Sequence, residues 1–351
     1  MTSVLPFRDP AAAGPIGPRP GRHPRLHRRY RRVLSGYAAR IAHADDPPLS
    51  PTTGSESPDG TDLRPRRSAL YLPGNKPRAL EKGKSLPADV LIFDLEDAVG
   101  PDAKAESRAA VCEAISSPDY RPREIVVRIN GLDTEWHDDD LAAVAGSAAD
   151  GVLVPKVETA QQVQALDRAL DTLGAAASLQ LWVMMETPRA FLRAEEVASA
   201  SDRLAGLVVG TNDLVNELHG RHVAGRGPVV PALGLALLGA RAAGKVVLDG
   251  VFNDITDDAG FRAEAAQGRE MGFDGKTLIH PSQIAPANEL FGPSQQELAD
   301  ARKVVSAYQQ AQAAGTSVIT VDGRMIESLH VRDAQRILAL ADLISERDAA
   351  S

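Results

Sequence analysis

Residues 179–188 read LQLWVMMETP, a nearly unbroken apolar run that ends in the carboxylate Glu186. Continuous apolar runs of this length are typical of strands buried on both faces, as in a parallel sheet covered by helices. A buried carboxylate without a partner is costly, so such a group becomes protonated, pairs with a cation or holds a metal ion. The segment therefore predicts a buried strand with a site at its carboxyl end.

Seven more runs rich in Val, Ile and Leu accompany this one, with helix-like segments between them. In chain order, the eight runs are SALYLPG (68–74), VLIFDLED (90–97), EIVVRIN (124–130), GVLVPKV (151–157), LQLWVMMET (179–187), LAGLVVGTNDL (204–214), KVVLDGVFND (245–254) and GKTLIHPSQI (275–284). Eight such units in about 220 residues predict an α/β fold, the (β/α)8 TIM barrel. A doubly wound sheet is the alternative, but no G-x-G-x-x-G follows the first run.

The segments that flank the barrel predict different structures. Residues 1–63 are rich in Pro, Gly, Ser and Arg without a sustained period, which favours a disordered extension over an export signal or a transit peptide. Residues 64–292 form the predicted barrel domain. Residues 293–351 contain an amphipathic helix, the short segment TSVITVDGRM and a helix from about Ser328. They predict a C-terminal helical and hairpin extension that covers a site or joins subunits.

Composition and charge exclude several classes of protein. The net charge of −8 argues against a general nucleic-acid binder, because phosphate contacts need clustered Lys and Arg. The apolar runs are too short for a membrane span. Cys112 is the only cysteine, so neither an internal disulfide nor a cysteine metal cluster can form. We expect a cytoplasmic protein that binds neither nucleic acid nor membrane.

Polar side chains follow the apolar runs, at the strand ends where a barrel carries its chemistry. They are Asn75, Asp94, Glu96, Asp97, Arg128, Lys156, Glu186, Asn212, Asp213, Asp249, Asn253, Asp254 and His280. A single one of them is more often a helix cap, as Asp213 in TNDLVNEL could be, but caps explain the convergence of so many poorly. The surplus of oxygen ligands, without Cys and with one nearby His, suits Mg²⁺ or Mn²⁺ and not zinc.

Arg128 has two interpretations from the residues alone. It ends the apolar run VVRIN, and its planar guanidinium suits a substrate carboxylate, which it can bind through two parallel hydrogen bonds. An ion pair with Asp94 or Glu96 is the other interpretation, and the sequence does not separate the two.

Together these motifs resemble the HpcH/HpaI aldolase/citrate lyase superfamily, and within it the citrate lyase beta-subunit-like CoA ester lyases. The matching pieces, between about residues 66 and 345, are LYLPGN, VLIFDLEDAV, VVRIN, VLVPKVET, the Glu of MMETP, GTNDL, GFDGKTLIHPSQI, FGPS and VDGRMIES. The resemblance implies a carbon–carbon lyase that cleaves or forms a 3-hydroxyacyl-CoA such as malyl-CoA, methylmalyl-CoA or citramalyl-CoA, with an acyl-CoA and a 2-keto acid as its partners. A citrate lyase beta subunit acting on a citryl-acyl-carrier protein, a metal-dependent hydroxy-keto acid aldolase and a catalytically silent homologue are the alternatives.

The resemblance also implies a metal centre. Glu186 and Asp213 correspond to the ligands of Mg²⁺, for which Mn²⁺ is a substitute, and Glu96 and Asp97 would orient metal-bound waters. Arg128 would bind the carboxylate of the small acid. The metal would polarise the oxygen of a 2-keto acid or of the matching hydroxy acid.

Further residues would serve the thioester. Asn75, Lys76, Arg78 and His280 correspond to the region that receives the CoA part. Glu327 stands where the family has an Asp that moves a proton at the thioester carbon in a neighbouring subunit's site, which implies a homo-oligomer, a trimer or a hexamer. The extra methylene of Glu moves the carboxylate by about an ångström, a displacement that can cost on the order of a hundredfold in rate.

Overall fold

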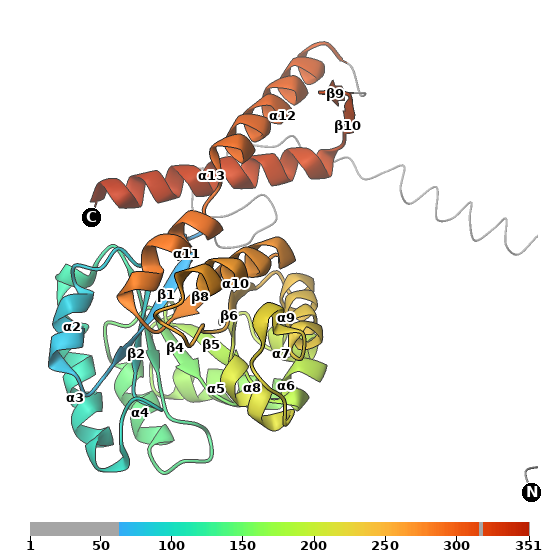
Figure 1. Cartoon of the computed structure of the whole chain (residues 1–351). Helices are drawn as coiled ribbons and strands as arrows, with labels where there is room; N and C mark the ends of the chain where they lie inside the picture. The colour runs from blue at the N-terminus through green and yellow to red at the C-terminus, as the bar shows by residue number, and fades with distance from the viewer. Residues whose placement is uncertain (1–62, 316–318, 351) are drawn as a thin grey trace, which may run out of the picture. The chain divides into compact units, whose positions relative to one another are not determined.

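Each of the eight apolar runs contains one strand of a closed parallel barrel in the computed structural model, which describes residues 63–315 and 319–350. The strands pair in chain order, and the last one closes onto the first. They are β1 (Ser68–Pro73), β2 (Val90–Asp94), β3 (Glu124–Arg128), β4 (Gly151–Val154), β5 (Gln180–Met185), β6 (Leu204–Val209), β7 (Val246–Asp249) and β8 (Gly275–Leu278). The (β/α)8 barrel predicted from the sequence is therefore confirmed (Figure 1).

Helices connect the successive strands and cover the outside of the barrel. They are α2 (Pro77–Gly83), α3 (Lys104–Ala114), α4 (His137–Ala145), α5 (Ala160–Thr172), α6 (Pro188–Leu192), α7 (Ala194–Ala198), α8 (Thr211–Glu217), α9 (Val230–Ala242), α10 (Asp258–Met271) and α11 (Ile284–Phe291). Short 3-10 helices add η1 (Pro101–Ala103), η2 (Pro118–Tyr120), η3 (Ala224–Arg226) and η4 (Pro281–Gln283).

The C-terminal extension consists of two helices and a hairpin. It comprises α12 (Gln295–Ala313), the antiparallel pair β9 (Ile319–Val321) and β10 (Arg324–Ile326), and α13 (Ser328–Ala350). The helical and hairpin extension predicted from the sequence is therefore present. The predicted disordered extension, residues 1–63, lies outside the described residues except for Leu63.

Side chains alternate between the inside and the outside of the barrel along each strand. The barrel interior contains the indole of Trp182, one of the largest fully buried side chains, so the neighbouring strands must leave space for it. A Cβ atom at Gly151 would lie 2.9 Å from the Trp182 ring, and one at Gly206 would lie 2.7 Å from it. The glycines of β4 and β6 therefore make space for the indole, while the outward-facing aliphatic side chains pack under the helices.

The same alternation decides which strand-end side chains face the top of the barrel interior. Val126 and Trp182 belong to the interior cluster, as does Met184. Side chains separated by an even number of residues on a strand point to the same side. The side chain of Arg128 therefore points the same way as that of Val126, and the side chain of Glu186 points the same way as those of Trp182 and Met184. Both charged side chains are thus directed toward the barrel axis at the carboxyl ends of the strands.

The C-terminal end of α13 contacts the opposite rim of the barrel, where the strands begin. Arg347 forms an ion pair with Asp89, which precedes β2. Asp348 lies 3.8 Å from Arg67, which precedes β1. The last turns of the chain are therefore fixed at the amino end of the barrel, away from the strand ends that carry the polar cluster.

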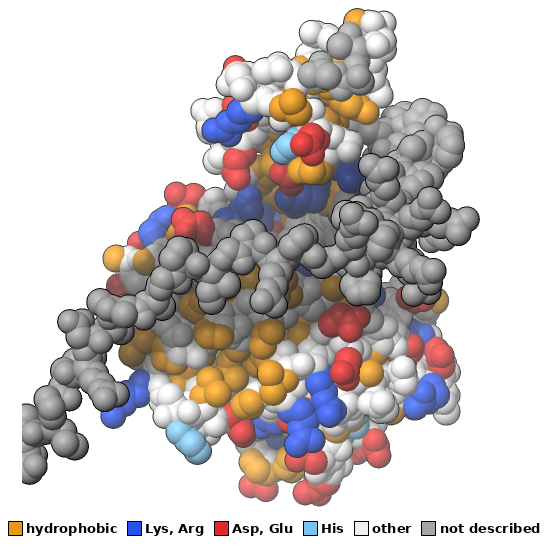
Figure 2. Space-filling view, turned by 90° about the vertical axis from the view of Figure 1, so that its right-hand side faces the viewer, with side chains coloured by type: hydrophobic (Ala, Val, Ile, Leu, Met, Phe, Trp, Pro, Cys, Tyr) orange, Lys and Arg blue, Asp and Glu red, His pale blue; other side chains and the backbone are white. Residues whose placement is uncertain are grey.

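One face of the barrel exposes apolar helix residues. Hydrophobic side chains gather on the side that carries α9 (Figure 2). Leu192 of α6 is 78% exposed, and Leu235 and Leu238 of α9 are 38% and 71% exposed.

None of the helices within the described residues has the length and apolar character that crossing a membrane requires.

Candidate active site

A cavity of about 360 Å³ opens at the carboxyl ends of the strands. Side chains from the ends of most of the strands line it, as expected for a barrel enzyme. Its polar lining consists of Tyr71, Asp94, Asp97, Arg128, Thr211, Asn212, Asp213 and Thr277. The structure thus brings together many of the strand-end residues that the sequence singled out.

Glu186 lies directly after β5 and is almost completely buried, with 1% of its surface exposed. Its Oε1 accepts a hydrogen bond of 2.8 Å from the backbone N–H of Lys156. Burial, together with the charges of Glu96 and Asp213, raises the pKa of the Glu186 carboxyl to about 8. Gly210 closes the pocket on the other side, since a Cβ atom there would lie 2.6 Å from Glu186 Oε2.

Asp213 lies in the first turn of α8 but does not cap it. The N-cap residue is Gly210, and no side chain caps this helix. The helix-cap interpretation of Asp213 is therefore wrong, and its carboxylate is available at the cavity, 3.9 Å from the ammonium of Lys156. The negative charges of Asp213 and Glu96 lie near the buried carboxyl of Glu186. A cation bound among them would stabilise the ionised form of Glu186.

The residues present fit a magnesium ion better than a metal that needs a full protein cage. Within the described part of the chain, no group of three or more His, Cys, Asp or Glu side chains is placed to hold a metal. Mg²⁺, however, is usually bound by one or two carboxylates and takes its remaining ligands from water and substrate. Glu186 and Asp213 satisfy that requirement, and their metal-binding role stays a prediction.

Arg128 is held by several carboxylates. Its Nε and Nη2 each donate a hydrogen bond of 2.7 Å to Asp94, and its Nη1 lies 2.8 Å from Glu96 and 3.3 Å from Asp97. The guanidinium also lies over the Tyr71 ring, 4.9 Å from its centroid. The ion-pair interpretation is therefore confirmed for Asp94 and Glu96. Because Arg128 also lines the cavity, binding of a substrate carboxylate stays a prediction.

Glu96 lies close enough to Glu186 for its charge to act on that carboxyl, and it differs from its neighbour Asp97 in burial. Asp97 is exposed, whereas Glu96 is partly buried. Burial raises the pKa of Glu96 to about 7, against the opposing effect of Arg128. Orientation of metal-bound waters by these two side chains remains a prediction.

The residues predicted to receive CoA lie at the edge of the site. Asn75 follows β1, and its Oδ1 is buried without a hydrogen-bond partner among the described residues. Lys76 and Arg78 are exposed at the start of α2. His280 caps η4, where its Nδ1 accepts a hydrogen bond from the N–H of Ser282. None of the four predicted residues lines the 360 Å³ cavity, so their CoA-binding role stays a prediction.

Glu327 lies between β10 and α13 and is exposed. Its N–H donates to Nδ1 of His330, and its carbonyl accepts hydrogen bonds from the N–H groups of His330 and Val331. No hydrogen bond or ion pair described in the structure joins it to the barrel. The described contacts of Glu327 are thus all with its own neighbours in sequence.

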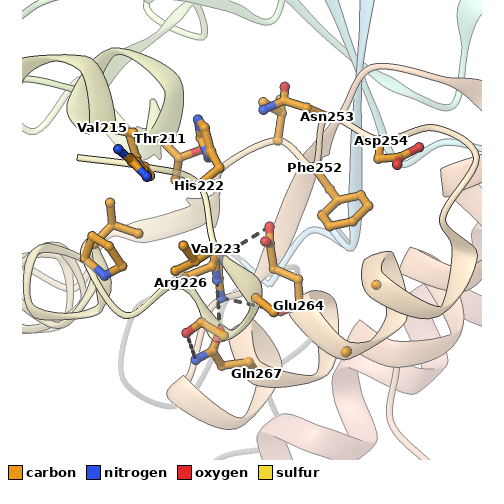
Figure 3. A pocket seen from close by; sticks show the side chains of 18 of the residues that line it. Thr211, Val215, His222, Val223, Arg226, Phe252, Asn253, Asp254, Glu264 and Gln267 are labelled. Atoms are coloured by element: carbon orange, nitrogen blue, oxygen red, sulfur yellow. Dashed lines mark hydrogen bonds and ion pairs between the residues drawn. The ribbon is translucent and has the colours of Figure 1, made fainter. Parts of the chain in front are cut away.

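A second, larger cavity lies beside the first, and the two share Thr211 and Val251 as lining residues. Figure 3 shows Arg226 in this cavity of about 530 Å³, with dashed lines to its partners. Arg226 Nη1 pairs with Asp249, which is completely buried and also contacts Lys276. Asp249 therefore belongs to a buried ion-pair network outside the barrel, although the sequence placed it among the residues of the active-site rim.

Lys156 is the site residue whose role the sequence did not reveal. The sequence marked it as a strand-end cation, but the structure shows that it contacts both predicted metal ligands. Gly210 was also overlooked, although GTNDL contains it. The sequence around Lys156 carries no signal for this position, because the contact is with a residue 30 positions away.

Comparisons with known proteins agree with the motifs. Residues 67–281 match the family model described as HpcH/HpaI aldolase/citrate lyase. A (3S)-malyl-CoA thioesterase from Cereibacter sphaeroides is 48% identical over 80% of this chain and 96% of its own length. An L-malyl-CoA/beta-methylmalyl-CoA lyase from the same species is 34% identical, with 80% and 96% covered.

A solved structure shows the same likeness in three dimensions. The protein CitE from Mycobacterium tuberculosis, in complex with magnesium, acetoacetate and coenzyme A, has a TM-score of 0.64 and is 33% identical. The likeness covers 78% of this chain and 97% of that one. The resemblance inferred from the sequence motifs is therefore confirmed.

Proposed function

The chain belongs to the HpcH/HpaI aldolase/citrate lyase family, and from this premise we propose that it is a Mg²⁺-dependent enzyme acting on (3S)-malyl-CoA or a closely similar 3-hydroxyacyl-CoA. The observation that carries the proposal is that Asp213 and Arg128 line one cavity at the strand ends. The buried carboxyl of Glu186 lies directly behind Gly210, which lines the same cavity. Two relatives with different reactions, the thioesterase and the lyase, both have a malyl-CoA in their names. The substrate class is thus better supported than the bond that is broken.

We propose thioester hydrolysis as the reaction. The thioesterase relative is 48% identical to this chain over the aligned residues, against 34% for the lyase relative. Hydrolysis adds a water oxygen to the thioester carbon, breaks the carbon–sulfur bond and leaves a water proton with the departing CoA sulfur. The products of malyl-CoA would be malate and free CoA.

Carbon–carbon cleavage is the second candidate. The arrangement of Arg128 beside the two metal carboxylates supports it, because a small keto acid needs a cationic partner for its carboxylate and a metal for its keto oxygen. Cleavage would break the bond between the hydroxyl carbon and the carbon next to the thioester. Malyl-CoA would then give acetyl-CoA and glyoxylate.

In either reaction the chain's own residues would fix the substrate and the ion. Mg²⁺, when bound to Glu186 and Asp213, would supply Lewis-acid polarisation of a substrate oxygen. The two hydrogen bonds to Asp94 and the contact with Tyr71 fix the orientation of the Arg128 guanidinium. A substrate carboxylate would bind at its Nη1, where it would take the place of Glu96 or Asp97.

The proton-transferring carboxylate would come from another subunit. Glu327 precedes a helix of 23 residues, about 35 Å long. The far end of this helix is fixed at the amino rim of its own barrel by the ion pair between Arg347 and Asp89. This attachment supports a role of Glu327 in a neighbouring site, and therefore a homo-oligomer, which we propose to be a trimer or a hexamer.

Product analysis distinguishes the reactions. The full chain is incubated with (3S)-malyl-CoA and Mg²⁺, and CoA, acetyl-CoA, malate and glyoxylate are quantified by chromatography. Free CoA and malate in equal amounts, absent with Glu186→Gln, are the expected result. Formation of acetyl-CoA and glyoxylate would show that the enzyme cleaves the carbon–carbon bond and does not hydrolyse the thioester. Unchanged thioester, also with methylmalyl-CoA and citramalyl-CoA, would overturn the proposal and favour a carrier-protein substrate or a silent homologue.

A further inference from the structure

Lys156 has an unusual backbone conformation beside the metal carboxylates. It follows β4 after one proline, and its φ angle is +54°. Residues other than glycine seldom adopt this left-handed conformation, and where they do, their surroundings hold them there, often at functional sites. The contacts of Lys156 should therefore explain its conformation.

The contact that holds the backbone is the hydrogen bond to Glu186. Oε1 of Glu186 accepts it from the N–H of Lys156 at 2.8 Å. A carboxylate that is 99% buried, as the 1% exposure of Glu186 implies, needs such a donor because water cannot supply one. The main chain of Lys156 is thus fixed against one of the two predicted metal ligands.

The side chain of Lys156 is directed at the other ligand. Its Nζ lies 3.9 Å from Oδ1 of Asp213, and about half of the side chain, 52%, is exposed. Within the described residues, Lys156 is the one Lys or Arg that forms an ion pair with Asp213. Arg128, the other cation of the site, is engaged by Asp94, Glu96 and Asp97 instead.

We infer that Lys156 is an internal counter-cation of the metal site, a positioning residue that pairs with Asp213 until a divalent ion displaces it. The inference rests on the proposed assignment of Glu186 and Asp213 as the ligands. An ammonium at this position competes for the Asp213 oxygen and repels an incoming dication. Its partly exposed side chain lets it swing away while its N–H keeps Glu186 in place.

This role predicts a gain in metal affinity when the charge is removed. Lys156→Met keeps the length and the N–H but removes the ammonium, so the full-length protein should bind Mn²⁺ about tenfold more tightly than the unmodified protein. Lys156→Gly should show the same gain, because glycine keeps the N–H and accepts the positive φ angle. Lys156→Arg, which retains the charge, should bind Mn²⁺ like the unmodified protein.

The titration uses free Mn²⁺ measured by electron paramagnetic resonance, with thermal unfolding as a check on the fold. Lys245→Met is the matched control, because Lys245 precedes β7 at the opposite rim, and it should leave the affinity unchanged. Unchanged or weaker Mn²⁺ binding by both neutral variants would overturn the inference, since a merely structural Lys156 predicts weaker binding. If the unmodified protein binds no Mn²⁺, the ligand assignment and the inference both fail; if it binds Mn²⁺ but turns over no malyl-CoA, only the proposed reaction fails.

Discussion

The carboxyl group of Glu186 makes the stability of the metal-free protein depend on pH. Its pKa is raised from 4.5 to about 8, mainly by burial and in part by the charges of Glu96 and Asp213. Between about pH 4.5 and 8 the folded protein therefore retains a proton that the unfolded chain has already lost. The contribution of Glu186 to stability is fully present below pH 4.5 and is lost as the pH rises toward 8.

We expect the melting temperature of the metal-free protein to fall more steeply between pH 5 and 8 than that of Glu186→Gln. Mg²⁺ should restore the melting temperature of the unmodified protein at pH 8, because the ion replaces the proton. Calorimetry on both proteins, with and without Mg²⁺, measures this. Parallel pH profiles of the two proteins would show that Glu186 does not titrate in this range.

Gly210 leaves the space in which the Glu186 carboxylate lies. A Cβ atom there would be 2.6 Å from both Cβ and Oε2 of Glu186, too close for any side chain to be accommodated without movement. Gly210→Ala should therefore weaken Mn²⁺ binding by about tenfold or more while the barrel still folds. Gly234→Ala in α9 is the control, since its added methyl meets no atom within 4 Å. Equal affinities in the two variants would contradict the packing argument.

The pairing of β4, β5 and β6 depends on glycines that accommodate Trp182. A methyl group at Gly206 would lie 2.7 Å from the indole and 2.8 Å from the carbonyl oxygen of Val246. Gly206→Ala should lower the free energy of unfolding by about 1–3 kcal/mol, as overpacking of a core does. Urea denaturation measures the change, with Gly100→Ala, where a Cβ atom meets nothing within 4 Å, as the reference. Equal stability of both variants would show that the interior can adjust.

The strands were predictable because burial on both faces leaves a plain apolar pattern in the sequence. All eight runs contain a strand, and the helix-like segments between them contain helices such as α3, α5 and α10. Glu186 was predictable for the same reason, since a carboxylate that ends a buried run must have a partner. The family motifs then supplied the predicted roles of the site residues.

Other features depend on which way a side chain points, which the pattern of apolar residues does not record. Asp249 ends a strand as Glu186 nearly does, but it faces outward and binds Arg226 and Lys276. His280 lies at a strand end and serves as a helix cap. The left-handed backbone of Lys156 arises from a hydrogen bond to a residue 30 positions away, so no local motif predicts it.

In the proposed homo-oligomer, assembly would determine whether each barrel receives a complete set of residues. If Glu327 serves a neighbouring subunit, Glu186→Gln and Glu327→Ala should each be inactive alone, and mixing them after dissociation should restore part of the activity. The recovery arises because some sites in mixed oligomers combine an intact Glu186 with an intact Glu327. Turnover after reassembly is the measurement. Inactive mixed oligomers, or a fully active Glu327→Ala protein, would assign the proton transfer to another group.

The location of the metal tests the central claim most directly, because the proposed chemistry and the role of Lys156 both depend on it. Crystals of the full-length protein soaked in Mn²⁺ give an anomalous signal at the ion's position. We predict one peak bonded to a carboxylate oxygen of Glu186 and one of Asp213, and its loss in Glu186→Gln. A peak held by other residues, or no peak at a Mn²⁺ concentration that supports turnover, would contradict the account.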